Sequence, residues 1–314
     1  MKDLSNSYFK EILYRVQGVH YFFREKFTKN LFNKIKFKKN KIKLNSLQLD
    51  LVNSIEEKGY AKVSIDQLFQ DKNNFIFEFN QIVEQIKKTN DYEYALKYFN
   101  KNFEENGKHY IHRINDNKDF QIDINSILLK FILSDKILEI VNAYFKMYAK
   151  LDIADLWITF FNDKIKSRRN AQRWHRDRDD IKILKIFLYL GDIDENNGAT
   201  EYIQYSKKYQ KYGYLSKFSY GNIAGWKVYP EEDKINKSLD MKDKIILRGK
   251  TGTIYFVDTT GLHRGGYSNI NKKERIFGYW SFLTPASLLK KKNYIKPNKR
   301  ELDKLNFLQR MAIY

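Results

Sequence analysis

The sequence of 314 residues contains no cysteine. Without cysteine the chain cannot form a disulfide framework, which fits a protein of the reducing cytoplasm. No apolar run reaches the roughly 20 residues that a membrane-spanning helix needs. The first residues also lack the charged and then apolar segments that mark a signal peptide. We therefore expect a soluble, cytoplasmic protein.

Negative charge is scarce. The 38 Asp and Glu residues stand against 58 Lys and Arg residues, which gives a formal net charge of +20. A charge of this size fits an acidic partner such as nucleic acid, phospholipid headgroups or a phosphorylated substrate. The chain is also rich in Lys, Asn, Ile, Phe and Tyr, as an AT-rich genome favours. Codon bias alone would raise the lysine content, so the charge does not decide between these explanations.

The order of the predicted elements indicates the fold class. Apolar residues recur at helical spacing before about residue 150, whereas short β-branched and aromatic runs alternate with turn signals after it. We expect helices over residues 7–38, 46–57, 72–105 and 300–311, and one or two helices over residues 124–148. We expect strands over residues 61–65, 156–161, 183–190, 252–258 and 276–282. Helices followed by strands are typical of an α+β fold in which helices pack against one antiparallel sheet system.

The chain has three prolines, no internal repeat and no linker. The simplest division is a basic helical N-terminal extension over residues 1–45 and one catalytic domain over residues 46–314. The β core of that domain spans about residues 150–285, and a basic helix follows it.

The N-terminal extension has the pattern of a basic amphipathic helix. Within residues 19–43 one apolar stripe is flanked by lysines, and its members are Phe23, Phe27, Leu31 and Ile35. Such a helix can lie on an anionic membrane surface. The alternative, which we favour, is that the stripe packs on the catalytic core while the lysines stay solvated.

Two short motifs carry the candidate chemistry. His175 and Asp177 are two residues apart, so in an extended segment their side chains leave the backbone on the same side. A second imidazole, His263, lies in another strand-like stretch. Two imidazoles and one carboxylate on one face form a triad that binds Fe(II) and leaves coordination positions open. The pair alone is a weak signal, because chance often supplies a His-x-Asp sequence.

The neighbours of these motifs make the signal more specific. Gln172-Arg173-Trp174-His175-Arg176-Asp177 is followed by the apolar run 183–190 and by the turn Asn196-Asn197-Gly198. A Gly-led strand then precedes Gly261-Leu262-His263-Arg264-Gly265-Gly266, and Arg275 opens one more strand. In this order the chain resembles the phytanoyl-CoA dioxygenase family of Fe(II)/2-oxoglutarate oxygenases, over roughly residues 150 to 285.

This resemblance implies a double-stranded β-helix, the jelly roll of cupin-like folds, with helices from the N-terminal half beside it. It implies that His175, Asp177 and His263 are the catalytic iron ligands, and that 2-oxoglutarate and O2 are co-substrates. Arg275 matches the family's receptor for the distal carboxylate of 2-oxoglutarate, which a guanidinium can grip with two hydrogen bonds. Related halogenases have a small residue where this chain has Asp177, so hydroxylation is expected. Residues 202–208 lack the Gly-Ser-His signature of many members, so the family's substrates are not carried over.

Other residues are predicted to line the site. Lys185 and Tyr189 share one face of the 183–190 strand, which points to the pocket or to solvent, and in the first case they contact the co-substrate. Four residues beside the metal are predicted to contact the substrate: Gln172, Trp174, Arg178 and Arg264. Arginines near the iron indicate an anionic substrate, although the basic charge of the whole chain also explains them. Asp258 is a candidate to orient a histidine, or a plain turn residue.

The sequence therefore predicts an Fe(II)- and 2-oxoglutarate-dependent dioxygenase that hydroxylates a small or medium-sized organic molecule, with release of succinate and CO2. One alternative is a non-catalytic β-roll that binds an anionic membrane surface or nucleic acid, although no strong nucleic-acid signal is present. A continuous basic face would favour that alternative. Another is a cupin-type metalloenzyme without redox chemistry. Such barrels usually supply additional His or Glu ligands, and this chain has five histidines.

Overall fold

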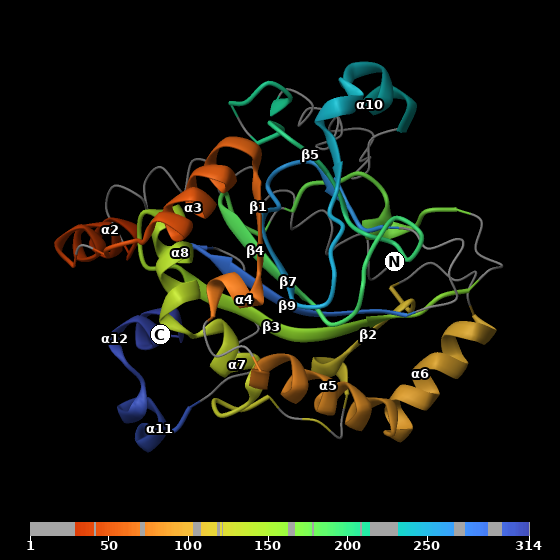
Figure 1. Cartoon of the computed structure of the whole chain (residues 1–314), viewed down its shortest axis with the longest axis horizontal. Helices are drawn as coiled ribbons and strands as arrows, with labels where there is room; N and C mark the ends of the chain where they lie inside the picture. Colours follow the sequence, from red (N-terminus) through yellow and green to blue (C-terminus); the bar gives the residue numbers. More distant parts are fainter. Residues whose placement is uncertain are drawn as a thin grey trace, which may run out of the picture.

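The computed structural model describes residues 29–40, 42–69, 73–102, 108–117, 120, 122–162, 167–177, 179–207, 209–213, 232–266, 274–287 and 297–313. In these ranges the chain forms a larger and a smaller antiparallel sheet, with helices against the outer side of the larger one (Figure 1). The predicted α+β class is confirmed. Within the same ranges no helix is both long and apolar enough to cross a membrane.

The larger sheet has six strands in the order β1-β7-β4-β9-β3-β2. Their bounds are Tyr60–Ser64 for β1, Ile111–Arg113 for β2, Lys150–Thr159 for β3, Ile183–Tyr189 for β4, Thr253–Asp258 for β7 and Arg275–Leu283 for β9. β4 lies near the centre, where Lys185 pairs with Val257 on one side and with Ser281 on the other. Strands distant in sequence therefore lie side by side in the sheet, as a jelly roll requires.

The smaller sheet contains β6 (Lys244–Ile246), β5 (Glu201–Ile203) and β8 (His263–Arg264), in that order. Beyond β8 an isolated antiparallel bridge joins His263 to His175, so the segment around His175 continues the sheet. Charged groups hold this sheet together. Glu201 of β5, which is buried, accepts ion pairs from Arg168, Lys244 and Arg264.

The helices occupy most of the N-terminal half and the C-terminal end. The α-helices are α2 (Lys29–Lys39), α3 (Ser46–Lys58), α4 (Ile65–Leu68), α5 (Asn73–Lys87), α6 (Asn90–Lys101), α7 (Ile127–Ile132), α8 (Asp135–Phe145), α10 (Glu232–Ser238), α11 (Lys299–Lys304) and α12 (Phe307–Ile313). The 3-10 helices are η1 (Ile114–Asp116), η2 (Asn170–Gln172) and η4 (Met241–Asp243). α3 ends at Gly59, whose φ of 91° favours glycine, and a Cβ there would collide with Tyr202.

Two predicted helices are each divided in two, and the 124–148 segment, for which one or two helices were predicted, forms two. Thr89 caps the start of α6 by accepting a hydrogen bond from the Tyr92 amide, so the 72–105 segment splits into α5 and α6. Ser134 begins α8 and splits 124–148, and the 300–311 segment splits after Leu305. Residues 7–28 of the first predicted helix lie outside the described ranges, and α2 carries its remainder.

Side chains on β4 alternate between two environments. Leu184, Ile186 and Leu188 point to the helices and join the main hydrophobic core. On the neighbouring strand, the ring of Trp280 packs 4.9 Å from that of Phe131 on α7, and its indole N–H donates to Leu128 O. The opposite, inner face of the sheet carries a separate cluster that includes Phe187, Tyr279 and Tyr255.

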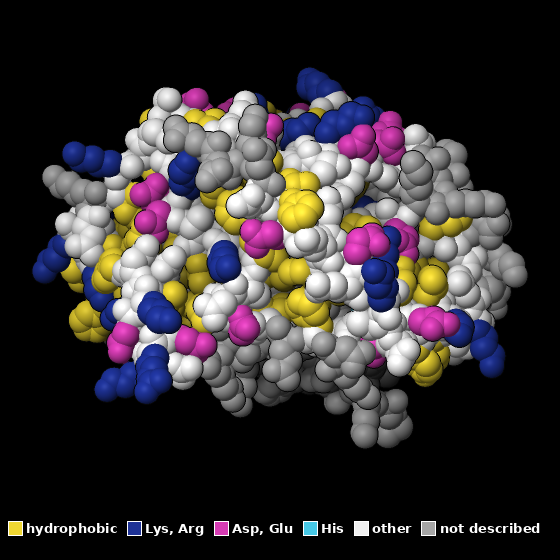
Figure 2. Space-filling view, turned by 60° about the horizontal axis from the view of Figure 1, so that its bottom comes forward, with side chains coloured by type: hydrophobic (Ala, Val, Ile, Leu, Met, Phe, Trp, Pro, Cys, Tyr) yellow, Lys and Arg dark blue, Asp and Glu magenta, His cyan; other side chains and the backbone are white. Residues whose placement is uncertain are grey.

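The described part of the N-terminal extension packs against the rest of the chain. Asn30 accepts a hydrogen bond from the Ala286 amide, and Phe37 lies edge-on to Tyr148 at 5.6 Å. Phe32 and Ile35 remain 71% and 43% exposed, so membrane contact through residues 19–43 stays a prediction. On the face that Figure 2 shows, the Lys and Arg side chains of the described residues are scattered among Asp and Glu, and these residues form no continuous basic surface there.

Candidate active site

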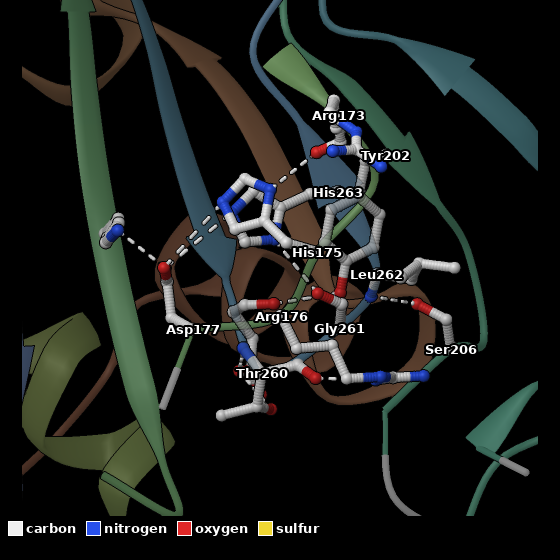
Figure 3. Close-up of polar contacts among 12 residues, drawn as sticks. Arg173, His175, Arg176, Asp177, Tyr202, Ser206, Thr260, Gly261, Leu262 and His263 are labelled. Carbon is white, nitrogen blue, oxygen red and sulfur yellow. Dashed lines mark hydrogen bonds and ion pairs between the residues drawn. The ribbon is translucent and has the colours of Figure 1, made fainter. Parts of the chain in front are cut away.

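The two histidines of the predicted triad are direct cross-strand partners. The His175 amide donates to His263 O at 2.9 Å, and the His263 amide donates to His175 O at 3.0 Å. Residues opposite each other in an antiparallel pair place their side chains next to each other, and here the ring centroids are 4.3 Å apart. The Asp177 amide donates to Thr259 O at 2.9 Å. Asp177 therefore faces the two imidazoles (Figure 3).

Backbone carbonyls fix the tautomer of both imidazoles. His175 Nδ1 lies 2.8 Å from Arg173 O, and His263 Nδ1 lies 3.0 Å from Gly261 O. A carbonyl oxygen only accepts hydrogen bonds, so each Nδ1 must carry the proton. Each Nε2 then presents its lone pair toward Asp177. This is the arrangement of a metal-binding histidine, whose second nitrogen donates to an acceptor that orients the ring.

The three side chains are close enough to share one ion. His175 Nε2 is 4.0 Å from Asp177 Oδ1, and His263 Nε2 is 3.6 Å from Asp177 Oδ2. One ligand atom from each residue lies within 4.8 Å of the others, and the described residues contain no second group of this kind. Nitrogen and oxygen donors stand about 2.0–2.2 Å from a bound transition metal, so an ion fits between these atoms. The donor set matches the triad that holds Fe(II).

Burial keeps this donor set in its ligating protonation state. Burial, with repulsion from His263, lowers the pKa of His175 to about 3, and burial also lowers the pKa of His263. Both imidazoles are therefore neutral at neutral pH. Burial alone would raise the pKa of Asp177, but Lys185 and the two imidazoles hold it well below its usual range. The site offers two neutral nitrogens and one carboxylate.

Lys185 reaches the same point from β4. Its Nζ lies 2.5 Å from Asp177 Oδ2 and 5.4 Å from the centre of the Tyr279 ring. Burial disfavours the ammonium, but the Asp177 carboxylate raises the pKa of Lys185 above its ordinary value. The lysine therefore points into the site, where it holds one oxygen of a predicted metal ligand.

Arg275 lies in the wall of the same cavity, which has a volume of about 290 Å³. It is 7% exposed, and its Nη1 donates to Gly198 O. Its Nε has no hydrogen-bond partner, and no carboxylate of the described residues lies within 4 Å of its guanidinium. A buried guanidinium with unused N–H groups beside a metal triad fits a receptor for the carboxylate of a bound acid.

The other predicted contact residues fall into two groups. Gln172 lines the cavity. Trp174 and Arg264 lie outside its wall: the Arg264 guanidinium is 4.4 Å from the Trp174 ring centre and forms ion pairs with Glu201 and Glu232. These contacts tie α10 to the strand that carries His263. Arg178 lies outside the described residues.

Two further side chains have structural contacts. Tyr189 is also outside the cavity wall, and its hydroxyl donates to Leu247 O at 2.7 Å. Asp258 accepts hydrogen bonds from Tyr144 and from Thr260. The two histidines are oriented by backbone carbonyls and not by Asp258. Asp258 instead holds the turn after β7 through its hydrogen bonds with Thr260.

The sequence reasoning missed the residues that β3 and its neighbours add to the cavity. Asp155 and Trp157 line it from β3, and Tyr279 lines it from β9. The Trp157 and Tyr279 rings are stacked, with centroids 4.1 Å apart, and Arg113 of β2 lies 5.1 Å from the Trp157 ring centre. The available signal was a polar residue, Asp155, at alternating spacing with Ile153 and Trp157 in a strand.

Comparisons with known proteins bear on the fold. Neither a protein-family model nor a curated protein sequence matches the chain, so the resemblance to the phytanoyl-CoA dioxygenase family stays a prediction. Among solved structures, the non-heme alpha ketoglutarate dependent epimerase SnoN from nogalamycin biosynthesis matches with a TM-score of 0.50 and 10% identity. The match covers 76% of this chain and 84% of SnoN.

SnoN in complex with Fe3+, alpha ketoglutarate and nogalamycin RO matches with a TM-score of 0.51, at the same identity and coverage. HygX from Streptomyces hygroscopicus, crystallised with nickel and 2-oxoglutarate, has a TM-score of 0.46 and 10% identity over 78% of this chain and 88% of HygX. These neighbours are enzymes that bind 2-oxoglutarate and a metal. The likeness to SnoN confirms the predicted jelly-roll fold.

Proposed function

We propose that this protein is an Fe(II)- and 2-oxoglutarate-dependent dioxygenase of the phytanoyl-CoA dioxygenase type, which hydroxylates an organic substrate. One observation carries the proposal. The Nε2 atoms of His175 and His263 and the carboxylate of Asp177 converge in a cavity whose wall also holds Arg275. SnoN, which has the same fold, binds Fe3+ and alpha ketoglutarate in its crystal, and this supports the choice of metal and co-substrate.

Each residue of the site has a defined part in this proposal. His175, Asp177 and His263 hold Fe(II) by one face, and the tautomers set by Arg173 O and Gly261 O leave both imidazoles ready to bind. Bound iron and 2-oxoglutarate supply the oxidising chemistry, in which O2 and 2-oxoglutarate yield succinate, CO2 and the hydroxylated substrate.

Two basic residues complete the co-substrate region. Arg275 binds the distal carboxylate of 2-oxoglutarate, for which its unused Nε–H is available. Lys185 holds Asp177 Oδ2, which leaves Oδ1 to the metal and restricts the carboxylate to one orientation. Arg275 is buried and the Lys185 side chain is 13% exposed, so water competes weakly with these contacts.

The experiment that tests the proposal measures Fe(II) binding and succinate release in two variants of the triad and in one control variant. His175→Ala and Asp177→Ala should lose stoichiometric Fe(II) binding and 2-oxoglutarate-dependent succinate release. His109→Ala, which changes a histidine outside the cavity wall, should retain both. Stoichiometric iron binding that survives in either triad variant would overturn the metal assignment. Folding of each variant is checked by circular dichroism.

A further inference from the structure

The wall of the metal cavity carries both signs of charge, although the chain as a whole is strongly basic. Its basic residues are Lys108, Arg113, Lys185 and Arg275, and its acidic residues are Asp116, Asp155, Asp177 and Asp179. The proposed function uses Asp177 together with Lys185 and Arg275. The remaining wall is not a basic surface, so it gives no support to the anionic substrate expected from the sequence.

Asp155 is the most enclosed acidic group of this wall that the proposed function leaves unused. It is 2% exposed and lies on the inner face of β3, between Ile153 and Trp157. Three N–H groups donate to it. Oδ1 accepts from the Leu156 amide at 2.9 Å and from the Asn115 amide at 3.2 Å, and Oδ2 accepts from Trp157 Nε1 at 2.9 Å.

No described cation is in direct contact with this carboxylate. Among the described residues, no Lys, Arg or His nitrogen lies within 4 Å of it. Arg113 of the same wall lies over the Trp157 ring and attracts the carboxylate without pairing with it. A buried carboxylate normally has a charged partner, because its desolvation is otherwise uncompensated. Burial raises the pKa of Asp155 to about 6, against the opposing effects of its hydrogen bonds and of the Arg113 charge.

The hydrogen-bond capacity of Asp155 is also incomplete. An ionised carboxylate has about four acceptor positions, and the Trp157 indole is the one described donor to Oδ2. Oδ2 therefore retains an acceptor position, and Asp155 belongs to the wall of a cavity that also holds the metal triad. A ligand that supplied both a positive charge and an N–H donor would meet both needs at once.

We propose that Asp155 is a substrate-binding residue that pairs with a protonated amine, so that the substrate class is a cationic amine. This inference rests on the proposed function for the reaction, but the binding of the amine is separable from it. The alternative is that Asp155 only anchors η1 through Asn115 and orients Trp157. That alternative predicts a loss of stability without any change in the preference for a charged ligand.

The test uses three small probes of matched size: butylamine, 1-butanol and butyrate. Each is titrated by calorimetry at pH 7.5 into the protein loaded with Ni(II) and 2-oxoglutarate. The wild-type protein should bind butylamine at least tenfold more tightly than the alcohol or the acid. Asp155→Asn should reduce the affinity for butylamine to that for butanol, and Asp116→Asn, which removes a more exposed carboxylate of the same wall, should keep the preference.

Several outcomes would overturn the inference. They are no measurable binding of butylamine, equal affinity for the three probes, or a preference for the amine that survives in Asp155→Asn. If the amine instead coordinated Ni(II) directly, the affinity for butylamine would be the same in the wild type and in Asp155→Asn. If Asp155→Asn does not fold, Asp155→Ser replaces it. Failure to load Ni(II) and 2-oxoglutarate would count against the proposed function alone, and the titration of the metal-free protein then tests Asp155 by itself.

Discussion

The two faces of the large sheet differ in what they hold. Toward the helices, β4 and β9 present Leu184, Ile186 and Trp280, which belong to one continuous hydrophobic core. Toward the small sheet, the same two strands present Lys185 and Tyr279 to the metal cavity. Successive residues of a strand point to opposite sides, so one strand serves both purposes. The outer face stabilises the fold, and the inner face carries the residues of the candidate active site.

The energetics of the two faces differ accordingly. Burial of a large apolar side chain on the outer face contributes about 1.5–3 kcal/mol. The inner face buries charged groups, whose desolvation opposes folding unless each has a partner. Lys185 and Asp177 are partners at 2.5 Å, whereas Asp155 accepts three N–H hydrogen bonds and has no described cation within 4 Å. Substitutions on the outer face should therefore change stability alone, and substitutions on the inner face should change how stability depends on metal, pH and ligand.

The largest effect is expected at the outer face. Trp280 is fully buried, packs on Phe131 and donates to Leu128 O. Trp280→Ala should lower the free energy of unfolding by about 3–5 kcal/mol, because it leaves a large cavity in the core and removes the hydrogen bond to Leu128 O. Chemical denaturation measures this loss, and Ni(II) affinity of the folded variant should not change. The control is Phe77→Ala on α5, whose side chain is 62% exposed. Equal losses in the two variants would contradict the assignment of the core.

The next largest effect is a loss of stability on the inner face that depends on whether metal is bound. Lys185→Met leaves the Asp177 carboxylate without its cation and should destabilise the metal-free protein by about 3 kcal/mol. Ni(II) should recover most of this loss, because the ion supplies the missing positive charge. Lys97→Met removes the exposed ion pair with Glu93 and should cost less than about 1 kcal/mol, with or without metal. A loss in Lys185→Met that Ni(II) does not recover would contradict the proposed contact.

The pH dependence of stability tests the buried carboxyl of Asp155. Burial raises its pKa to about 6 in the folded chain, compared with an ordinary value of 3.8 for an exposed Asp. The folded state then binds more protons than the unfolded state between these values, so Asp155 reduces stability as the pH rises from 4 to 7. Relative to Asp155→Asn, the wild type should lose up to about 3 kcal/mol over this range. Denaturation at a series of pH values measures the change, and parallel curves for the two proteins would refute it.

The smallest of these effects concerns the co-substrate. Arg275→Lys keeps the charge at the cavity wall but removes the two-pronged geometry. The dissociation constant for 2-oxoglutarate should rise about tenfold, which corresponds to about 1.4 kcal/mol, while Ni(II) affinity stays the same. Equilibrium dialysis of labelled 2-oxoglutarate measures the change. An unaltered dissociation constant would mean that the distal carboxylate is bound elsewhere.

Much of the fold was predictable because it depends on local pattern. The ends of β4, β7 and β9 lie within one or two residues of the predicted ends, because their apolar runs stop at clear turn residues. The helix break at Thr89 was missed, whereas a break within residues 124–148 was left open and falls at Ser134. Both are residues that favour helix starts, but each stands inside a long apolar pattern that appears continuous.

The site was predictable in its residues and less so in its geometry. A recognisable order of motifs singled out His175, Asp177 and His263. Their convergence depends on the pairing of His175 with His263, and pairing between distant segments leaves no periodic signal in one sequence. Asp155 was missed because the predicted strand began at Leu156, whereas β3 begins at Lys150. Trp174 and Arg264 were placed in the site by their nearness to ligands, but adjacent strand residues point to the other side.

The most direct test of the central claim is an anaerobic titration of the protein with Fe(II) and then with 2-oxoglutarate, followed by visible absorption. The account predicts a metal-to-ligand charge-transfer band that appears only when both are present and that is absent in His263→Ala. A folded wild-type protein that shows no such band with both ligands would contradict the account.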